Sequence, residues 1–383
     1  MKMKSIFLIF GVFVLFPFFV FSNNTHYDLV KISIPSENII RACANDQMDL
    51  AVTYYDPTVY EPDAFEHSEN PFVLPRAFCS YFYSSEENKS DIIPSSVLLK
   101  ITNSRKILGL TTHNGITRPF IWTLEDGLKL LPIPPNSIVV TASDINEKGE
   151  AVGTALCKIG NDFFLKTLKW EKDSSLQKII ENHLSYEKIY DKDDDTFDID
   201  DIVLPRIYIN EFGVIFGNYY EPTEDKLMLF TYNKGVVKSQ LCGLYDTLQA
   251  NGLNNSGTFL ASSPFEKDNI LKIYQKNILN GDLFAYVCGP REVLGATFSP
   301  DLQQNIEIEK TEVLPLLSEK GVLILGLSLY IKNFGEENYY FLFDEHNGFQ
   351  EIPELKDSNI EAKTTEGKLL IKKNYDYFLA IPR

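Results

Sequence analysis

The chain has 383 residues, of which 44% are hydrophobic, so it can bury a large core and does not have the composition of a disordered protein. Its formal net charge is −17, which opposes binding to nucleic acid and to anionic lipid head groups. Aromatic residues make up 13% of the chain, with 27 Phe and 20 Tyr, and this composition favours β-strands.

The first 22 residues have the pattern of a secretory signal peptide. Lys2 and Lys4 precede an apolar run over 6–21, and Ser22 stands at the expected cleavage position before a polar segment. The apolar run is short for a membrane span, and no later stretch is long enough to cross a membrane. We expect cleavage near Ser22, a periplasmic or extracellular location, and a single mature domain over 23–383. An uncleaved N-terminal anchor is the alternative.

Residues 27–35, YDLVKISIP, form the first strand-like segment of the mature chain. They resemble the fourth strands of the repeats described below, whereas the last repeat ends at Arg383 without a fourth strand. We expect this N-terminal strand to complete the last repeat and to protect its edge hydrogen bonds. An ordinary edge strand on a two-sheet sandwich is the alternative.

A four-residue turn pattern then recurs along the chain. Its best copy lies within SDINEKGEAVG at 143–153, where Asn146 at the first position and Gly149 at the fourth favour a tight turn between antiparallel strands. Every copy opens on a short side chain that can accept a backbone hydrogen bond. The expected first residues are Asn45, Asn103, Asn146, Asn210, Asn254, Ser318 and Thr364. Two copies lack glycine at the fourth position, where Met48 and Lys106 stand instead.

Each turn belongs to a larger unit of four expected strands. An aromatic strand follows the turn, for example RPFIW at 118–122, and a second turn leads to a short fourth strand such as GLKLLPIP at 127–134. The closer copies are spaced 43 to 46 residues apart, which suits a propeller blade of ~40–50 residues. One such sheet cannot bury both faces, but stacking copies around an axis buries them. We predict an all-β, seven-bladed β-propeller closed by the N-terminal strand, with six or eight blades as alternatives.

The best copies also resemble a known family. DINEKGEAVG at 144–153, together with the F-x-W strand and the Gly- and Leu-containing strand within 118–131, is similar to bacterial extracellular repeat proteins of the His-Ala-Phe (HAF) type. Arg118-Pro119 replaces His-Ala here, and most copies lack the tryptophan. The resemblance implies export and a propeller-like repeat fold, and it supplies no active site.

Three stretches are longer than the repeat requires: 56–76, 181–201 and 288–310. Counting strands places all three on the face opposite the Asn-x-x-Gly turns, and we call this the loop face. Long loops on a rigid scaffold commonly carry function. We therefore predict that the loop face binds another macromolecule.

The middle stretch contains the acidic run DKDDDTFDIDD at 191–201. Asp191, Asp193 and Asp195 match the start of a calcium loop, whose hard oxygen ligands surround the ion. Thr196 and Ile202 then occupy positions that should be Gly and Glu. A calcium site, a contact for a cationic partner and a solvated acidic loop all remain open.

Three histidines, His67, His113 and His183, map to the same face and are candidate binding residues, although no metal-binding spacing joins them. The five cysteines form no C-x-x-C pair. Cys43 and Cys79 lie in the first repeat and are the best candidates for a disulfide; small buried hydrophobic residues are the other interpretation.

No nucleophile elbow, phosphate-binding loop or zinc-protease motif occurs in the chain. We predict a monomeric, exported, non-catalytic binding module. The alternative is a propeller-based hydrolase or lyase acting on a glycan or a small ester. An enzyme would need titratable groups from several blades to converge, and the candidates on inner strands are Arg41, Asp144, Arg206 and Glu361.

Overall fold

The structure is a computed structural model. It describes residues 27–32, 39–55, 78–84, 89–93, 96–184, 190–191, 196–197, 205–221, 226–240, 249–263, 271–277, 283–288, 298–299, 306–314, 323–331, 335–344, 348–364, 366–374 and 376–382.

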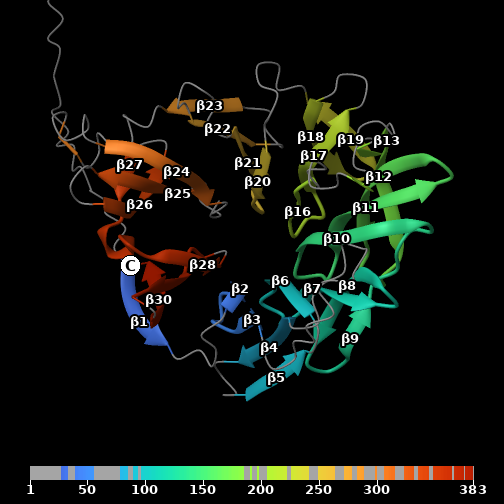
Figure 1. Ribbon diagram of the computed structural model, residues 1–383, viewed down its shortest axis with the longest axis horizontal. Helices are drawn as coiled ribbons and strands as arrows, with labels where there is room; N and C mark the ends of the chain where they lie inside the picture. Colours follow the sequence, from blue (N-terminus) through green and yellow to red (C-terminus); the bar gives the residue numbers. More distant parts are fainter. Residues whose placement is uncertain are drawn as a thin grey trace, which may run out of the picture.

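Seven four-stranded antiparallel sheets make up most of these residues, and in Figure 1 they follow one another in chain order around a common centre. In the first six, the strands follow in sequence order, and the first strand of each lies nearest the centre.

The first sheet contains β2 (Ile39–Ala44), β3 (Leu50–Tyr55), β4 (Phe78–Ser84) and β5 (Lys89–Ile93). The second contains β6 (Ser96–Ile101), β7 (Ile107–His113), β8 (Ile116–Thr123) and β9 (Gly127–Leu130). The third contains β10 (Ser137–Ile145), β11 (Ala151–Ile159), β12 (Asp162–Trp170) and β13 (Leu176–Leu184). The fourth sheet contains β16 (Ile207–Ile209), β17 (Ile215–Glu221), β18 (Lys226–Asn233) and β19 (Val236–Gln240). The fifth contains β20 (Gln249–Leu253), β21 (Thr258–Ser263), β22 (Leu271–Asn277) and β23 (Leu283–Cys288). The sixth contains β24 (Ile306–Leu314), β25 (Leu323–Ile331), β26 (Gly335–Asp344) and β27 (Gly348–Glu351). The seventh sheet is β28 (Asn359–Lys363), β29 (Leu369–Lys373), β30 (Asp376–Pro382) and β1 (Tyr27–Ile32), and a separate hairpin is β14 (Tyr190–Asp191) with β15 (Thr196–Phe197).

The seventh sheet contains both ends of the described chain. β1 runs antiparallel to β30, with Tyr27 opposite Pro382 and Ile32 opposite Tyr377, which is the pairing expected from residues 27–35. Figure 1 shows the blue β1 beside the red β30. The Tyr27 side chain is buried, and its hydroxyl donates a hydrogen bond to the Gly367 carbonyl at 3.3 Å.

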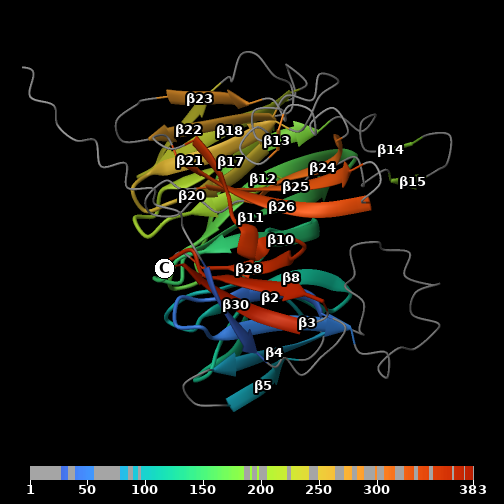
Figure 2. The ribbon, with the colours of Figure 1, turned by 90° about the vertical axis from the view of Figure 1, so that its left-hand side faces the viewer.

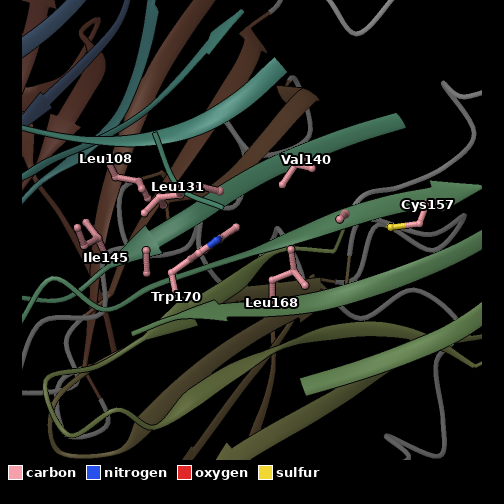
Figure 3. Packing of buried hydrophobic residues seen from close by; sticks show 10 residues of the cluster. Leu108, Leu131, Val140, Ile145, Cys157, Leu168 and Trp170 are labelled. Carbon is pink, nitrogen blue, oxygen red and sulfur yellow. The ribbon is translucent and has the colours of Figure 1, made fainter. Parts of the chain in front are cut away.

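Hydrophobic cores lie between neighbouring sheets. Figure 3 shows one of them, where Leu108 of the second sheet packs with Val140, Leu168 and Trp170 of the third. The Trp170 indole N–H donates to the Pro132 carbonyl at 2.7 Å, so the ring is also fixed by a polar contact. Comparable clusters of described residues join five other pairs of sheets. These pairs are sheets 1 and 2, sheets 3 and 4, sheets 4 and 5, sheets 6 and 7, and sheets 7 and 1. The sheets joined by these clusters therefore bury faces against one another, as the repeat pattern predicts.

The turns between the first and second strands follow the predicted pattern, with one correction. In the second sheet the turn opens on Thr102, because Arg105 N–H donates to the Thr102 carbonyl at 3.0 Å. Asn103 is the second residue of the turn, and Arg105, with φ of 59°, holds the fourth position expected for Lys106. Met48 also adopts positive φ, at 71°, so a non-glycine residue fills this strained position in two copies. The copy at Ser318 lies outside the described residues.

Three of the described turns are also tied to the next one by the side chain of their first residue. The Asn146 amide donates to the Asn210 carbonyl at 3.1 Å, and the Asn210 amide donates to the Asn254 carbonyl at 3.2 Å. Asn45 makes the same bond to Thr102, at 3.1 Å. The first residue of the repeat thus closes its own turn and holds the neighbouring sheet.

Cys43, Cys79 and Cys157 form no disulfide, so the candidate Cys43–Cys79 pair is not made, and Cys43 and Cys157 are buried as the other interpretation predicts. Cys43 lies on β2 and Cys79 on β4, with β3 between them. Two strand spacings amount to ~9.5 Å, which exceeds the ~7 Å that a disulfide can bridge. Within the described ranges, no helix is long and apolar enough to cross a membrane.

Candidate functional site

The acidic stretch predicted from the sequence contains a hairpin. β14 and β15 pair between the third and fourth sheets, with Tyr190 opposite Phe197 and Asp191 opposite Thr196. In Figure 2 these two strands lie at the right-hand margin, apart from the four-stranded sheets. Asp193 and Asp195 lie outside the described residues. The segment thus presents a folded element that is not part of any of the seven sheets.

The candidate histidines occupy different places. His113 is exposed at the end of β7, and His67 lies outside the described residues. His183 is on the outer strand β13, where its Nε2 is 3.0 Å from Asp162 Oδ1 and its ring meets Phe164 edge-on. Among the described residues, no three side chains capable of binding a metal come together.

A polar cluster that the sequence suggested only in part lies on the inner strands. Lys100 Nζ of β6 is 2.5 Å from Asp144 Oδ1 of β10, and Asp144 Oδ2 accepts the Ile209 N–H of β16 at 2.9 Å. The Asp144 side chain is 8% exposed and that of Lys100 37%. One nearly buried carboxylate therefore connects three neighbouring sheets, and both of its oxygens have partners.

β-Bulges set the register of this cluster. Leu99 and Ser143 are bulged residues in β6 and β10, each three positions before the first residue of the following turn. The residues after them, Lys100 and Asp144, consequently occupy equivalent positions in adjacent sheets, and Tyr208 holds that position in the fourth. Bulges re-aim side chains in this way without breaking the sheet.

Two arginines lie near this cluster, two residues further from the turns than Lys100 and Asp144 are. Each arginine stands four residues before the first residue of its turn. Arg41 of β2 and Arg206, directly before β16, are both exposed. The Arg41 Nη2 group donates to the Leu99 carbonyl at 3.4 Å, beside Lys100. Burial raises the pKa of Tyr208 to about 12; Arg206 and Arg41 act in the opposite direction, and Asp144 adds to the rise. Tyr208 therefore remains a neutral hydrogen-bond donor near both arginines.

Lys363 ends the inner strand β28, which packs beside β2. It is half-buried, and its side chain has no hydrogen bond or ion pair within the part of the chain that the structure describes. Burial lowers its pKa to about 7; repulsion from Lys100 contributes, and attraction to Asp144 opposes the shift. Lys363 is thus a cation without a counter-charge of its own.

Of the four inner-strand candidates, Asp144 joins the cluster directly, and Arg41 and Arg206 lie close enough to influence Tyr208. Glu361 does not join it. It is the bulged residue of β28, burial raises its pKa, and the charge that acts on it is Lys372 of its own sheet. Lys100 and Lys363 are members that the sequence did not reveal.

No known protein family and no curated protein matches the chain. Solved structures do. The β-propeller domain of the trilobed protease from Pyrococcus furiosus aligns with a TM-score of 0.52 at 9% identity, over 90% of this chain and 92% of that one. Virginiamycin B lyase from Staphylococcus aureus aligns with a TM-score of 0.51 at 11% identity, over 94% and 100%. At such low identity these similarities show the fold alone, which is that of a β-propeller.

Proposed function

We propose that this β-propeller is an exported, non-catalytic binding module that contacts a macromolecular partner through its loop face. The observation that carries the proposal is the β14–β15 hairpin, a paired element that stands apart from the seven sheets within the acidic stretch 181–201. Rigid scaffolds commonly present their binding residues on such projecting segments. The resemblance of 144–153 to the extracellular HAF-type repeats supports export.

We further infer that the seven sheets are the blades of one ring that β1 closes. Six shared cores and the β1–β30 ladder support this inference. The junction between the fifth and sixth sheets is the one for which no shared core is described. A ring in which every face is covered explains how sheets of only four strands can be stable.

The partner's chemistry follows from charge. The acidic run 191–201 contains seven aspartates in a chain whose net charge is −17, so a cationic surface or a calcium ion is the matching ligand. Asp191, Asp193 and Asp195 are the residues proposed for the ion. The histidines His67, His113 and His183 would contribute to the surface around the hairpin.

Calcium is tested by thermal melting in millimolar calcium and in chelator. A bound ion would raise the Tm by mass action. The rise should vanish when Asp193→Asn and Asp195→Asn are combined, and should persist in the matched surface control Glu125→Gln with Asp126→Asn, which changes an exposed acidic pair on another loop. Without a calcium effect, a pull-down at low and high salt tests the cationic partner, because charge-driven contacts weaken as salt rises. Capture that is unchanged by salt and by the Asp193→Asn, Asp195→Asn variant would contradict the loop-face proposal.

Export is tested by fractionating cells that express the full chain. The expected product lies outside the cytoplasm and is shortened at or near Ser22. Full-length protein confined to the cytoplasm would contradict both the signal peptide and the export proposal.

Catalysis is the second candidate, because Lys100, Asp144 and Tyr208 converge from three sheets. A hydrolase or lyase acting on a glycan or small ester would use such a set as acid and base. Asp144 argues against this use, since its two oxygens are already bonded to Lys100 and to a backbone N–H. Turnover of a glycan or ester panel that disappears in Asp144→Asn, with the fold retained, would favour the enzyme.

A further inference from the structure

We propose that the inner-strand cations Lys363, Arg41 and Arg206, with Lys100 beside them, form an anion-binding site at the centre of the propeller. Its ligand is a group rich in anionic oxygen, a carboxylate or a phosphate. The site is separate from the loop face and its acidic stretch, so it goes beyond the binding function proposed above.

Charge balance is the first argument. The described cluster holds four basic side chains, whereas the one carboxylate within it, Asp144, is already paired with Lys100, and Glu211 interacts with Lys100 from the turn between β16 and β17. Arg206 and Lys363 have no ion-pair partner within the described ranges, and the contacts of Arg41 there are the Leu99 carbonyl and the Cys43 side chain, neither of which is a carboxylate. The whole chain is strongly acidic at −17, so uncompensated cations at its centre need an explanation. A bound anion supplies the missing charge.

Donor geometry is the second argument. Arg41 lies against the Leu99 carbonyl of the second sheet, and Arg206 precedes β16 of the fourth, so donors approach the centre from different sheets. An arginine fork can donate two hydrogen bonds to one carboxylate or phosphate, and a lysine adds a compact charge. Tyr208 stays protonated and contributes an O–H donor beside them. Donors on the inner strands of separate sheets can act together on a small anionic group.

The state of Lys363 supports this assignment. A lysine whose pKa is lowered to about 7 is only partly charged at neutral pH, because burial and the nearby Lys100 disfavour the cation. An anion nearby would favour the charged form, so binding should be accompanied by proton uptake. The groups that face Lys363 are Lys100 from β6 and Asp144 from β10; Arg41 lies on the adjacent β2.

The test is isothermal titration calorimetry on the full mature chain at pH 7.5, with inorganic phosphate and with citrate in separate experiments. The two probes distinguish phosphate from carboxylate recognition. We expect at least one to bind, and Lys363→Gln to weaken it about tenfold, the loss typical of one charge-assisted hydrogen bond. Lys129→Gln, which removes an exposed charge on β9, is the matched control and should leave the affinity within about twofold. Titrations in two buffers of different ionisation enthalpy should show proton uptake in the parent and less in Lys363→Gln.

Arg206→Gln provides a second variant that does not depend on how Lys363 affects folding. The Arg206 side chain is exposed, so its replacement should preserve the circular dichroism spectrum while weakening binding to a similar degree. The proposal is overturned if neither probe binds with a Kd below about 10 mM, or if both variants bind like the Lys129→Gln control. The Asp193→Asn, Asp195→Asn variant should keep full anion affinity, so the outcome here is independent of the loop-face proposal.

Discussion

Asn146 provides a direct test of the bonds that join one turn to the next. Its side chain is 1% exposed and makes three hydrogen bonds. The carbonyl oxygen accepts the Glu150 N–H at 3.0 Å, while the amide donates to Glu150 Oε2 at 2.7 Å and to the Asn210 carbonyl at 3.1 Å. The Asn146→Ala variant removes all three and leaves the Glu150 N–H without this acceptor, whereas the Asn210 carbonyl still accepts the Gly213 N–H at 3.0 Å.

The magnitude follows from these contacts. Each hydrogen bond contributes about 1 kcal/mol, and the one to the Glu150 carboxylate somewhat more. We expect Asn146→Ala to lower the free energy of unfolding by about 3–4 kcal/mol. The chain offers a graded control, because Thr102 and Thr364 occupy the same turn position and their hydroxyls accept the corresponding N–H at 3.0 and 3.1 Å. Asn146→Thr should keep that bond, lose the amide donor, and cost about 2 kcal/mol.

Urea unfolding curves of the parent and both variants measure these differences through the midpoint at constant m-value. The order of stability should be parent, then Asn146→Thr, then Asn146→Ala. If Asn146→Ala lies within about 0.5 kcal/mol of the parent, the bond between turns does not stabilise the fold. If the two variants are equally destabilised, the hydrogen bond that the residue 146 side chain accepts from the Glu150 N–H does not contribute as assigned.

Three further predictions concern packing, edge pairing and pH. Gly153→Ala would place a Cβ atom 2.0 Å from the Thr141 carbonyl oxygen, so it should cost about 3 kcal/mol or more, measured by the same urea curves; a cost under about 0.5 kcal/mol would contradict this close approach. Deleting 27–35 leaves one edge of β30 unpaired and should lower the Tm, and a Tm within about 2 °C of the parent would refute closure by β1. Burial raises the pKa of Glu150, but hydrogen bonds, chiefly from Lys169, outweigh burial and bring it below 4.5. The ionised Glu150 carboxylate therefore stabilises the fold above pH 4.5, and this stabilisation is lost as the pH falls through the pKa of the folded state. The Glu150→Gln variant should consequently lose less stability than the parent between about pH 7 and pH 3. Equal losses in the two proteins would contradict this prediction.

The turn repeat was the most predictable part of the fold, because Asn-x-x-Gly has few conformations to choose from. The error at Asn103 has a physical cause, since Thr102 and Asn103 can both open a turn. Asn103 instead serves the preceding turn, where its amide donates to Asp46 Oδ2 at 2.8 Å and its carbonyl oxygen accepts the Asp46 N–H at 2.8 Å. Such a contact joins residues 57 positions apart, and no local pattern reports it.

The same error hid part of the inner-strand cluster. With the turn placed one residue late, Lys100 falls at the bulged position, whereas the correct register makes it equivalent to Asp144. Lys363 had no comparable signal, because its position holds apolar residues in the other described sheets, such as Ile101 and Ile145. The bulges that set these directions depend on pairing between strands and could not be read from either strand alone.

The pairing of β1 with β30 has a consequence for the order in which the chain can be assembled. Tyr27 is among the first residues of the fold to leave the ribosome, and its partner Pro382 is nearly the last. At typical synthesis rates the β1 edge waits roughly 20–70 s for its complement, with its backbone donors and acceptors available to any other strand. A chain that is interrupted before β30 has no way to cover that edge. The β1 edge of a nascent copy is thus open to mispairing until β30 has been made.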